Sequence, residues 1–367
     1  MILHIRLVKV LLGLVVLVLA LLVVNYIGVL EGESQLLSEL NSRFLVRMRL
    51  LKPSGTTYFI PDASVLGLDS FHLEKKKYYY KVDSNGCIVT DANHQHPDLQ
   101  IAFFGGSTVQ CLFVDEGKRM PEVFTRHLEA LTGKKINVFN AAAGGSHSQH
   151  TINVLVNNLF DKRLDYAFFY ANLNDIGVLA HYGKYNNMNP EKGIFFNVEA
   201  YAALKGKSSE GFLGGVKNYF EAITGKTAYD EFKDVRGNQL ITDSTIVLSQ
   251  VEQALIQIIA ICKARQIQPV FVTEVNVMKM LSKSWYSRNM PVFQPTDEEY
   301  QQFLVLITQY NNLIVRLCHE QNIQVIDMRN FDTGFQYFYD AVHFNTRGSE
   351  KFGTDLANRF YKEYMAL

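Results

Sequence analysis

From residue 99 onward the chain alternates short apolar stretches with longer segments in which apolar residues recur at helical spacing. A helix between two strands favours parallel pairing, because a parallel pair needs a long crossover connection, and this crossover is right-handed. Repetition of the unit predicts an α/β domain of three layers, with a parallel sheet between two layers of helices. The five predicted strands are residues 99–104, 136–139, 166–170, 269–275 and 323–328.

Helix boundary signals lie between these strands. Pro121 near a helix start and Gly133 just past its end delimit the first helix. Thr296 followed by Glu299 is a capping box, which opens a second long helix. The predicted helices cover residues 121–131, 245–264, 297 to about 320, and 349–364.

Residues 176–242 do not follow this alternation. They are rich in Gly, Asn, Tyr and Lys and lie between the third and fourth predicted strands. We interpret them as an insertion over the strand ends. The insertion is either a lid or substrate platform, or a surface addition without a role in a site.

Near the N-terminus, residues 10–30 form an uncharged apolar run, which Arg6 and Lys9 precede and Glu31 follows. A run of about 20 apolar residues can span a bilayer as a helix, and it exceeds the apolar core of a cleavable signal peptide. No small-residue cleavage site follows the run. We therefore predict a transmembrane signal anchor, rather than a buried helix of a soluble core. The flanking charges favour a cytoplasmic N-terminus, which puts the rest of the chain on the periplasmic or extracellular side.

Between this anchor and the first strand, the composition changes twice. Residues 31–52 alternate leucines with polar residues, which predicts an amphipathic stalk helix. The aromatic-rich residues 53–98 contain Asn85-Gly86, which is typical of a tight turn between short strands. The predicted division is residues 1–30 for the cytoplasmic tip and anchor, 31–98 for the stalk and aromatic preamble, and 99–367 for the α/β domain.

Charge and cysteine content exclude several classes. The chain has 36 basic and 36 acidic residues, whereas binding to nucleic-acid phosphates needs a basic surplus. The four cysteines are widely spaced without a CxxC pair. His94 and His96 are close in sequence, but no further ligand motif completes a metal site. We therefore expect neither a metal ion nor another cofactor.

Ser107 directly follows the first predicted strand, behind Gly105 and Gly106. A nucleophilic serine exposes its hydroxyl while its backbone N–H points at the same reacting carbon, and small neighbours permit this turn. A glycine-rich loop after a strand can instead bind phosphate, but that use favours a lysine, which this loop lacks. The sequence therefore indicates a nucleophilic serine at the carboxyl end of the strand.

Asp340 and His343 follow the fifth predicted strand, just ahead of the last helix. This spacing lets the carboxylate reach one imidazole nitrogen while the other faces a serine. An acid, a base and a hydroxyl are the groups that acyl transfer through a serine requires. Because parallel strands end at the same edge of a sheet, we expect both residues to lie beside Ser107.

Two further loops end the strands on either side of the first strand, if the sheet order is 2-1-3-4-5. The second strand leads into Asn140 and then Gly145, and the third leads into Asn174 and Asp175. A glycine N–H and an asparagine amide that converge on Ser107 would form an oxyanion hole. A single loop asparagine is more often a cap, so the prediction depends on their shared position at adjacent strand ends.

Over about residues 100–367 the chain resembles the SGNH (GDSL-type) hydrolase family. The resemblance is carried, in order, by Gly105-Gly106-Ser107-Thr108, Asn140 with Gly145, Asn174-Asp175 and Asp340-x-x-His343.

This resemblance implies a flavodoxin-like α/β/α sandwich with Ser107 as nucleophile, His343 as base and Asp340 orienting the base. It also implies an oxyanion hole formed by the N–H of Ser107, the N–H of Gly145 and the side chain of Asn174.

The sequence departs from the family at two positions. Gly106 stands where the family often has aspartate, and Asn172 stands where it usually has glycine. Together with the anchor and the aromatic preamble, the motifs resemble membrane-anchored SGNH proteins of the bacterial envelope. Some relatives of that kind transfer acetyl or alanyl groups beside a multi-spanning membrane acyltransferase.

The expected activity is hydrolysis of O-acyl esters on an envelope glycan or a lipid, through an acyl-serine intermediate. The alternative is transfer of the acyl group to a surface polysaccharide, together with a multi-spanning partner. A third hypothesis is a non-catalytic glycan-binding scaffold on the same fold.

Three other polar or aromatic residues attract attention. His147 and His150 follow the second strand, and we expect them to be solvent-exposed loop residues rather than part of a cleft. Trp285 lies beyond the fourth strand, where carbohydrate stacking is conceivable but ordinary packing is the simpler expectation.

Overall fold

The structure is a computed structural model that describes residues 45–46, 50–51, 53–61, 73–90, 94–186, 194–196, 241, 243–280 and 296–366. The predicted anchor, Trp285 and most of the predicted insertion lie outside these ranges. Within the predicted stalk, residues 31–52, the described Leu45–Val46 form strand β1 rather than a helix.

The chain divides into two units, Met1–Val46 with Phe195–Glu231, and Arg47–Ile194 with Phe232–Leu367. In the first unit, β1 pairs antiparallel with β7, Phe195–Phe196. The second unit holds the predicted α/β domain.

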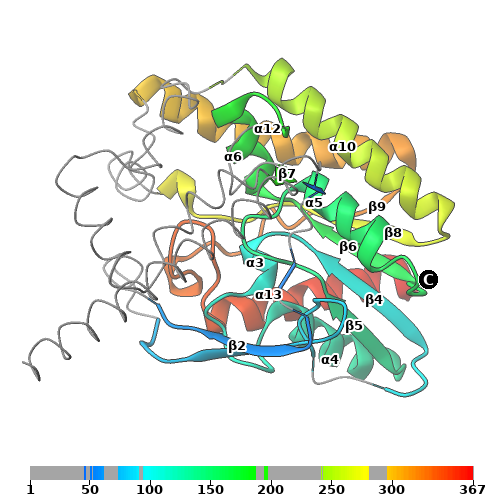
Figure 1. The fold of residues 1–367 in the computed structure, drawn as a ribbon. Helices are drawn as coiled ribbons and strands as arrows, with labels where there is room; N and C mark the ends of the chain where they lie inside the picture. The colour runs from blue at the N-terminus through cyan, green and yellow to red at the C-terminus, as the bar shows by residue number, and fades with distance from the viewer. Residues whose placement is uncertain are drawn as a thin grey trace, which may run out of the picture. The chain divides into compact units, whose positions relative to one another are not determined.

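The second unit is built around a five-stranded sheet in the order β5-β4-β6-β8-β9, in which every neighbouring pair is parallel (Figure 1). This confirms the predicted order 2-1-3-4-5. The order reverses at β4, so the loop after β4 opens at a switch point of the topology. The strands are β4 (Leu99–Phe104), β5 (Ile136–Asn140), β6 (Tyr166–Tyr170), β8 (Gln268–Val272) and β9 (Gln324–Ile326).

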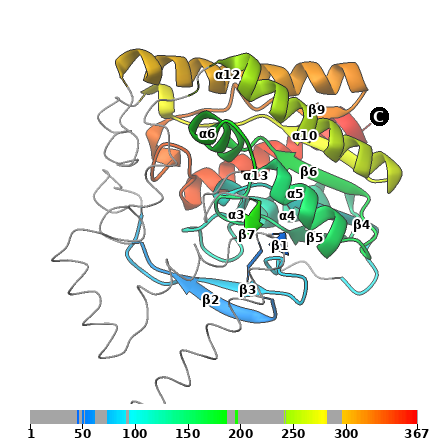
Figure 2. The same cartoon turned by 45° about the horizontal axis from the view of Figure 1, so that its top comes forward.

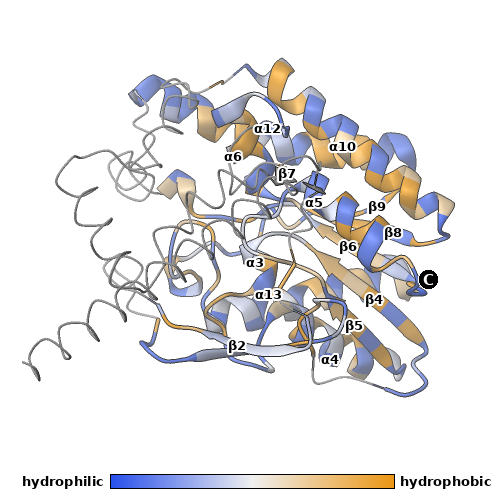
Figure 3. Ribbon diagram, viewed as in Figure 1, coloured by the Kyte–Doolittle hydropathy of each residue, from blue (hydrophilic) through white to orange (hydrophobic). Residues whose placement is uncertain are grey.

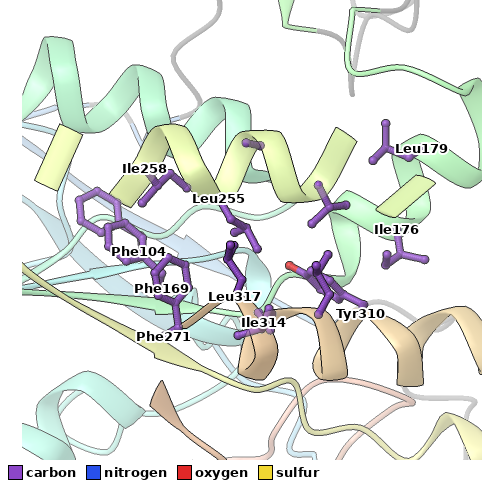
Figure 4. Packing of buried hydrophobic residues seen from close by; sticks show 14 of the residues in the cluster. Phe104, Phe169, Ile176, Leu179, Leu255, Ile258, Phe271, Tyr310, Ile314 and Leu317 are labelled. Atoms are coloured by element: carbon purple, nitrogen blue, oxygen red, sulfur yellow. The ribbon is translucent and has the colours of Figure 1, made fainter. Parts of the chain in front are cut away.

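Alternate residues of these strands enter two separate cores. On one face, Phe104, Phe169 and Phe271 pack against apolar side chains such as Leu255 and Ile314 (Figure 4). Four helices cover this face, and Figure 2 shows α12 and α10 beside one another. They are α5 (Ser148–Asn153), α6 (Leu173–Tyr182), α10 (Ser244–Ala264) and α12 (Asp297–Gln321).

On the other face, Phe103, Phe168 and Val270 pack against α4 (Met120–Thr132) and α13 (Thr346–Phe360). Phe124 of α4 and Phe360 of α13 meet there, with ring centroids 5.9 Å apart. Helices on both faces of a parallel sheet give the predicted three layers.

The described part of the second unit also contains four short helical turns. They are the π-helical turns Val154–Asn158 and Tyr361–Met365, and the 3-10 turns Met278–Met280 and Phe335–Tyr337.

α10 is the one helix in the described part of the chain that is long and apolar enough to cross a membrane. Its apolar residues nevertheless belong to the core, where Val247, Val251, Leu255 and Ile258 recur at helical spacing. The positions outside the core are mixed, since polar residues lie there together with the exposed Ile246 and Ile256. Figure 3 shows hydrophilic and hydrophobic residues along the helix. α10 is therefore a core helix of the α/β domain.

The aromatic preamble forms an antiparallel hairpin of β2 (Gly55–Phe59) and β3 (Tyr78–Val82), which belongs to the same unit as the sheet. Ile88, beyond the predicted turn, forms a bridge to Asn140 at the end of β5. The Tyr80 hydroxyl donates to the Cys111 carbonyl at 2.7 Å. The buried guanidinium of Arg119 lies over the Tyr80 ring at 4.4 Å. These contacts join the hairpin to the α/β domain.

Candidate active site

The predicted nucleophile lies where β4 ends and a single helical turn, α3 (Ser107–Gln110), begins. Ser107 is the first residue of this turn and is partly exposed. Its carbonyl accepts from the Cys111 N–H, and the Gly106 carbonyl accepts from the Gln110 N–H, both at 3.0 Å. These bonds fix the turn, so the hydroxyl is held at the carboxyl edge of the sheet.

The structure brings Ser107, His343 and Asp340 into one hydrogen-bonded row, although 236 positions separate the serine from the histidine. Ser107 Oγ lies 2.6 Å from His343 Nε2, and His343 Nδ1 lies 2.6 Å from Asp340 Oδ2. The second carboxylate oxygen of Asp340 accepts from the His343 N–H at 2.8 Å. The carboxylate therefore holds both the ring and the backbone of the histidine.

The loop that carries Asp340 and His343 is closed on itself. Phe338 and Phe344 form an antiparallel bridge, and the Tyr339 N–H donates to the His343 carbonyl at 3.0 Å. Asn345 caps α13, because its side chain accepts from the Gly348 N–H at 2.9 Å. The His343 imidazole thus projects from a short, cross-bonded loop at a helix start.

The electrostatics of this row favour a charged carboxylate. Burial alone would raise the pKa of Asp340, but the attraction of His343 and the hydrogen bonds to the carboxylate outweigh burial, and the pKa is lowered. The side chains of His343 and Asp340 keep 22% and 17% of their surface exposed, so both reach the protein surface.

A neighbouring thiol does not compete with the serine. Cys111 directly follows α3 and is buried, and its burial raises the pKa of the thiol to about 11. A thiol is a strong nucleophile only as a thiolate, and this one stays protonated at neutral pH. The four cysteines are all free and buried.

The loop after β5 runs beside Ser107. A Cβ placed on Gly144 would lie 3.9 Å from Ser107 Cβ. The Gly144 N–H donates to the side chain of Gln110 at 2.6 Å, which fixes this loop to α3. Gly145 has a φ of +72°, in the left-handed region where glycine alone is unstrained. Gln110 was not predicted as a site residue, although its position one helical turn after Ser107 is a usable signal.

Asn174 lies against the loop of the nucleophile. A Cβ placed on Gly106 would come within 2.5 Å of Asn174 Nδ2, so a larger residue there would displace this amide. Asn174 Nδ2 donates to the Ser146 carbonyl at 3.0 Å and to Asn172 Oδ1 at 2.9 Å. Both amide hydrogens therefore have protein acceptors in this structure.

Behind these loops Asp175 forms a buried network. Its carboxylate accepts from the Ser148 N–H at 2.9 Å, the Ser148 hydroxyl at 2.8 Å and the Tyr185 hydroxyl at 2.6 Å. Tyr310 of α12 donates to it at 3.3 Å and accepts from the Asn172 N–H at 2.9 Å. Burial raises the pKa of Asp175, although the hydrogen bonds oppose this rise. The network ties the loop after β5 to the start of α6.

Neither α5 nor α6 was predicted, and the expected exposure of His147 and His150 is wrong. Both imidazoles are fully buried, with ring centroids 3.8 Å apart. His147 and His150 belong to the start of α5, which folds inward over the sheet. The polar sequence around the two histidines did not reveal this burial, because it depends on tertiary contacts. One of these is with Tyr185, whose ring centroid lies 5.0 Å from that of His147.

His94, one of the two histidines that are close in sequence, contacts α4. His94 Nε2 pairs with Glu129 Oε1 at 2.7 Å. Among the described residues, no group of three or more histidine, cysteine, aspartate or glutamate side chains could hold a metal ion.

No protein-family model and no curated protein sequence matches this chain. Its fold is similar to that of a member of the lipolytic G-D-S-L family from Veillonella parvula (15% identity, 73% of this chain and 99% of the other, TM-score 0.39). It is also similar to an acetylxylan esterase from Geobacillus stearothermophilus (12% identity, 73% and 94%, TM-score 0.41). A third similar structure is the acetyl xylan esterase AlAXEase (14% identity, 73% and 100%, TM-score 0.41). At these identities the similarity concerns the fold, and the chemistry has to be argued from the residues of this chain.

Proposed function

We propose that this chain is a serine esterase that cleaves O-acyl esters through an acyl-serine intermediate. One observation carries the proposal: Ser107 Oγ, the His343 imidazole and the Asp340 carboxylate form a continuous row with two contacts of 2.6 Å. A base within hydrogen-bond reach of a hydroxyl, itself oriented by a carboxylate, is the arrangement that activates a serine.

In the first half of the reaction, Ser107 Oγ attacks the ester carbon while its proton moves to His343 Nε2. The bond from the carbon to the alcohol oxygen then breaks, and the alcohol leaves with that proton. Water next gives a proton to Nε2 and its oxygen attacks the acyl carbon. The acid is released and the serine hydroxyl is restored. Asp340 stabilises the imidazolium that exists between these transfers.

The tetrahedral intermediates of both halves place negative charge on the former carbonyl oxygen. We propose that the Ser107 N–H, the Gly145 N–H and the Asn174 amide donate to this oxygen. Ser107 supports this role because it is the first residue of α3, where N–H groups lack intrahelical acceptors. For Asn174, donation requires that its amide release either the Ser146 carbonyl or Asn172 Oδ1 when substrate enters.

We further propose that the enzyme is anchored by residues 10–30, with its α/β domain on the periplasmic or extracellular side. The substrates are then acyl esters of an envelope glycan or a lipid. The support is the length of the uncharged run and the charges on either side of it.

The first experiment is labelling of the full chain in detergent micelles with a fluorophosphonate, which reacts with activated serines. Labelling is expected for the wild type and for Ser249→Ala, a change at an exposed serine of α10. Ser107→Ala and His343→Gln should abolish it. If the folded wild type stays unlabelled, the chain is not a serine hydrolase, and the scaffold hypothesis is favoured.

Transfer to a sugar hydroxyl is a second candidate, because the acyl-serine can react with either water or an alcohol. The support is that the His343 and Asp340 side chains are partly exposed, so the acyl-serine would be accessible from solvent. The untreated wild-type enzyme, in which Ser107 is free to react, can be incubated with p-nitrophenyl acetate and an acceptor oligosaccharide. Acetylated sugar indicates transfer, whereas release of free acetate alone leaves hydrolysis as the activity.

A further inference from the structure

The His343 imidazole has an aromatic neighbour that the row of acid, base and nucleophile does not include. The Tyr339 ring lies almost parallel to it, with an interplanar angle of 7° and ring centroids 5.4 Å apart. The two residues face each other across the closed loop, because the Tyr339 N–H donates to the His343 carbonyl. The imidazole is therefore held at its edge by Asp340 and is stacked, with an offset, beside the ring of Tyr339.

Aromatic contacts connect Tyr339, through Phe113, to the N-terminal hairpin. The Tyr339 ring lies 5.4 Å from that of Phe113, which lies 5.7 Å from that of Tyr78 on β3. These three aromatic residues form one buried cluster with Leu73, Tyr80 and Ile88. The cluster leaves the Tyr339 ring little freedom to turn away from the histidine.

We propose that Tyr339 is a positioning residue for His343: its ring holds the imidazole toward Ser107 and stabilises the imidazolium that forms when the serine proton is transferred. The inference rests on the proposed function. An aromatic ring carries negative charge density on its face, and a cation that lies over this face within about 6 Å of the ring centroid is attracted to it. The measured separation falls in that range. The neutral imidazole gains less from the ring than the imidazolium does, so the contact favours the transition state.

The titratable groups around this pair are few. Asp340 lies on the same loop, and Tyr78, Tyr80 and Cys111 face Tyr339 from β3 and from the end of α3. Burial raises the pKa of Tyr78, Tyr80 and Cys111, which keeps these groups neutral at the pH of the assay. A change in the pH dependence on alteration of Tyr339 therefore reports on the histidine and not on these neighbours.

The test is the pH profile of kcat/KM for p-nitrophenyl acetate, measured on the full chain in detergent micelles. Activity rises with pH as His343 loses its proton, because only the neutral imidazole accepts from Ser107. Removal of the ring in Tyr339→Leu makes the imidazolium less favourable. The midpoint of the acid limb should move down by about 0.4–1.5 pH units, and the plateau should fall by about 2- to 30-fold. Tyr339→Phe keeps the ring and should match the wild type in both respects.

Phe338→Leu is the matched control, since Phe338 is a buried aromatic residue of the same loop whose ring packs on Phe344. It should lower stability without moving the midpoint. Because Tyr339→Leu can disturb folding, a second series replaces Tyr339 with phenylalanine and with pentafluorophenylalanine. Fluorination removes the negative face at nearly constant shape, so the midpoint should fall in the fluorinated form.

An unchanged midpoint in both Tyr339→Leu and the fluorinated form would overturn the inference, whatever happens to the plateau. An equal shift in Phe338→Leu would do the same, because it would show a general effect of loop packing. A wild type that neither hydrolyses the ester nor reacts with the fluorophosphonate would instead refute the proposed function, and this inference with it.

Discussion

Asn172 Oδ1 accepts hydrogen bonds from both the backbone N–H and the side-chain amide of Asn174, at 3.0 and 2.9 Å. The first bond caps α6 and the second orients the amide that we propose as an oxyanion donor. One asparagine therefore has a structural and a positioning role, at a place where the resemblance to SGNH hydrolases leads one to expect glycine.

Asn174→Ala is expected to lower kcat by roughly 10²- to 10³-fold with a smaller change in KM, because an oxyanion donor acts mainly in the transition state. The measurement is steady-state hydrolysis of p-nitrophenyl acetate. Fluorophosphonate labelling should persist at a reduced rate, since Ser107 and His343 are untouched. An unchanged kcat would show that the amide serves only the loop that it contacts.

Asn172→Ala removes the cap of α6 and is expected to lower the free energy of unfolding by about 0.5–2 kcal/mol. Denaturant unfolding followed by circular dichroism measures this loss. Asn172→Ser provides the comparison, because a serine oxygen can still cap the helix. Equal stability of the alanine and serine variants would contradict a capping role.

Acid should weaken the contribution of Asp340 to stability. Its pKa is lowered in the folded chain, whereas an unfolded aspartate titrates near about 3.9. The stabilisation is therefore present above the unfolded value and is lost as pH falls through the folded one. The advantage of wild type over Asp340→Asn in unfolding free energy should be constant near neutrality and shrink on acidification below about pH 4.

Tyr80→Phe should destabilise the α/β domain, because it deletes the buried hydroxyl that donates to the carbonyl groups of Cys111 and Leu112. A buried acceptor left without its donor costs about 1–3 kcal/mol. Thermal unfolding measures the change. Tyr79→Phe is the control, since the Tyr79 side chain on the opposite face of β3 is half exposed and should tolerate the loss.

The parallel sheet could be predicted, and so could the proximity of the Ser107 and His343 motifs. Both depend on the alternation of apolar strands with amphipathic helices. Buried strands need apolar runs, and the helix between them makes neighbouring pairs parallel, so Ser107 and His343 were expected at one edge. The structure adds their hydrogen bond, at 2.6 Å. A strand pattern predicts at which edge of the sheet a residue lies, but not the orientation of its side chain. This contact could therefore not be predicted from the sequence.

What could not be predicted depends on contacts between segments far apart in sequence. α6 begins in a polar stretch, and its start is fixed by α12, where the Tyr310 hydroxyl accepts from the Asn172 N–H. His147 and His150 are polar by composition, yet packing buries them. Tyr339 has no local motif, since its position follows from Phe113 and, through it, from β3.

The bridge between Ile88 and Asn140 has a mechanical consequence. Ile88 N–H donates to the Asn140 carbonyl at 2.8 Å, and the Asn140 side chain donates to the Val109 carbonyl, within the turn that begins with Ser107. A tension applied along the polypeptide just after β3 would reach the turn of Ser107 through these two hydrogen bonds, in parallel with the bond from the Tyr80 hydroxyl to the Cys111 carbonyl. The hairpin and the segment that follows it are thus connected by hydrogen bonds to the turn that carries Ser107, so a force on the N-terminal segment is transmitted to this turn.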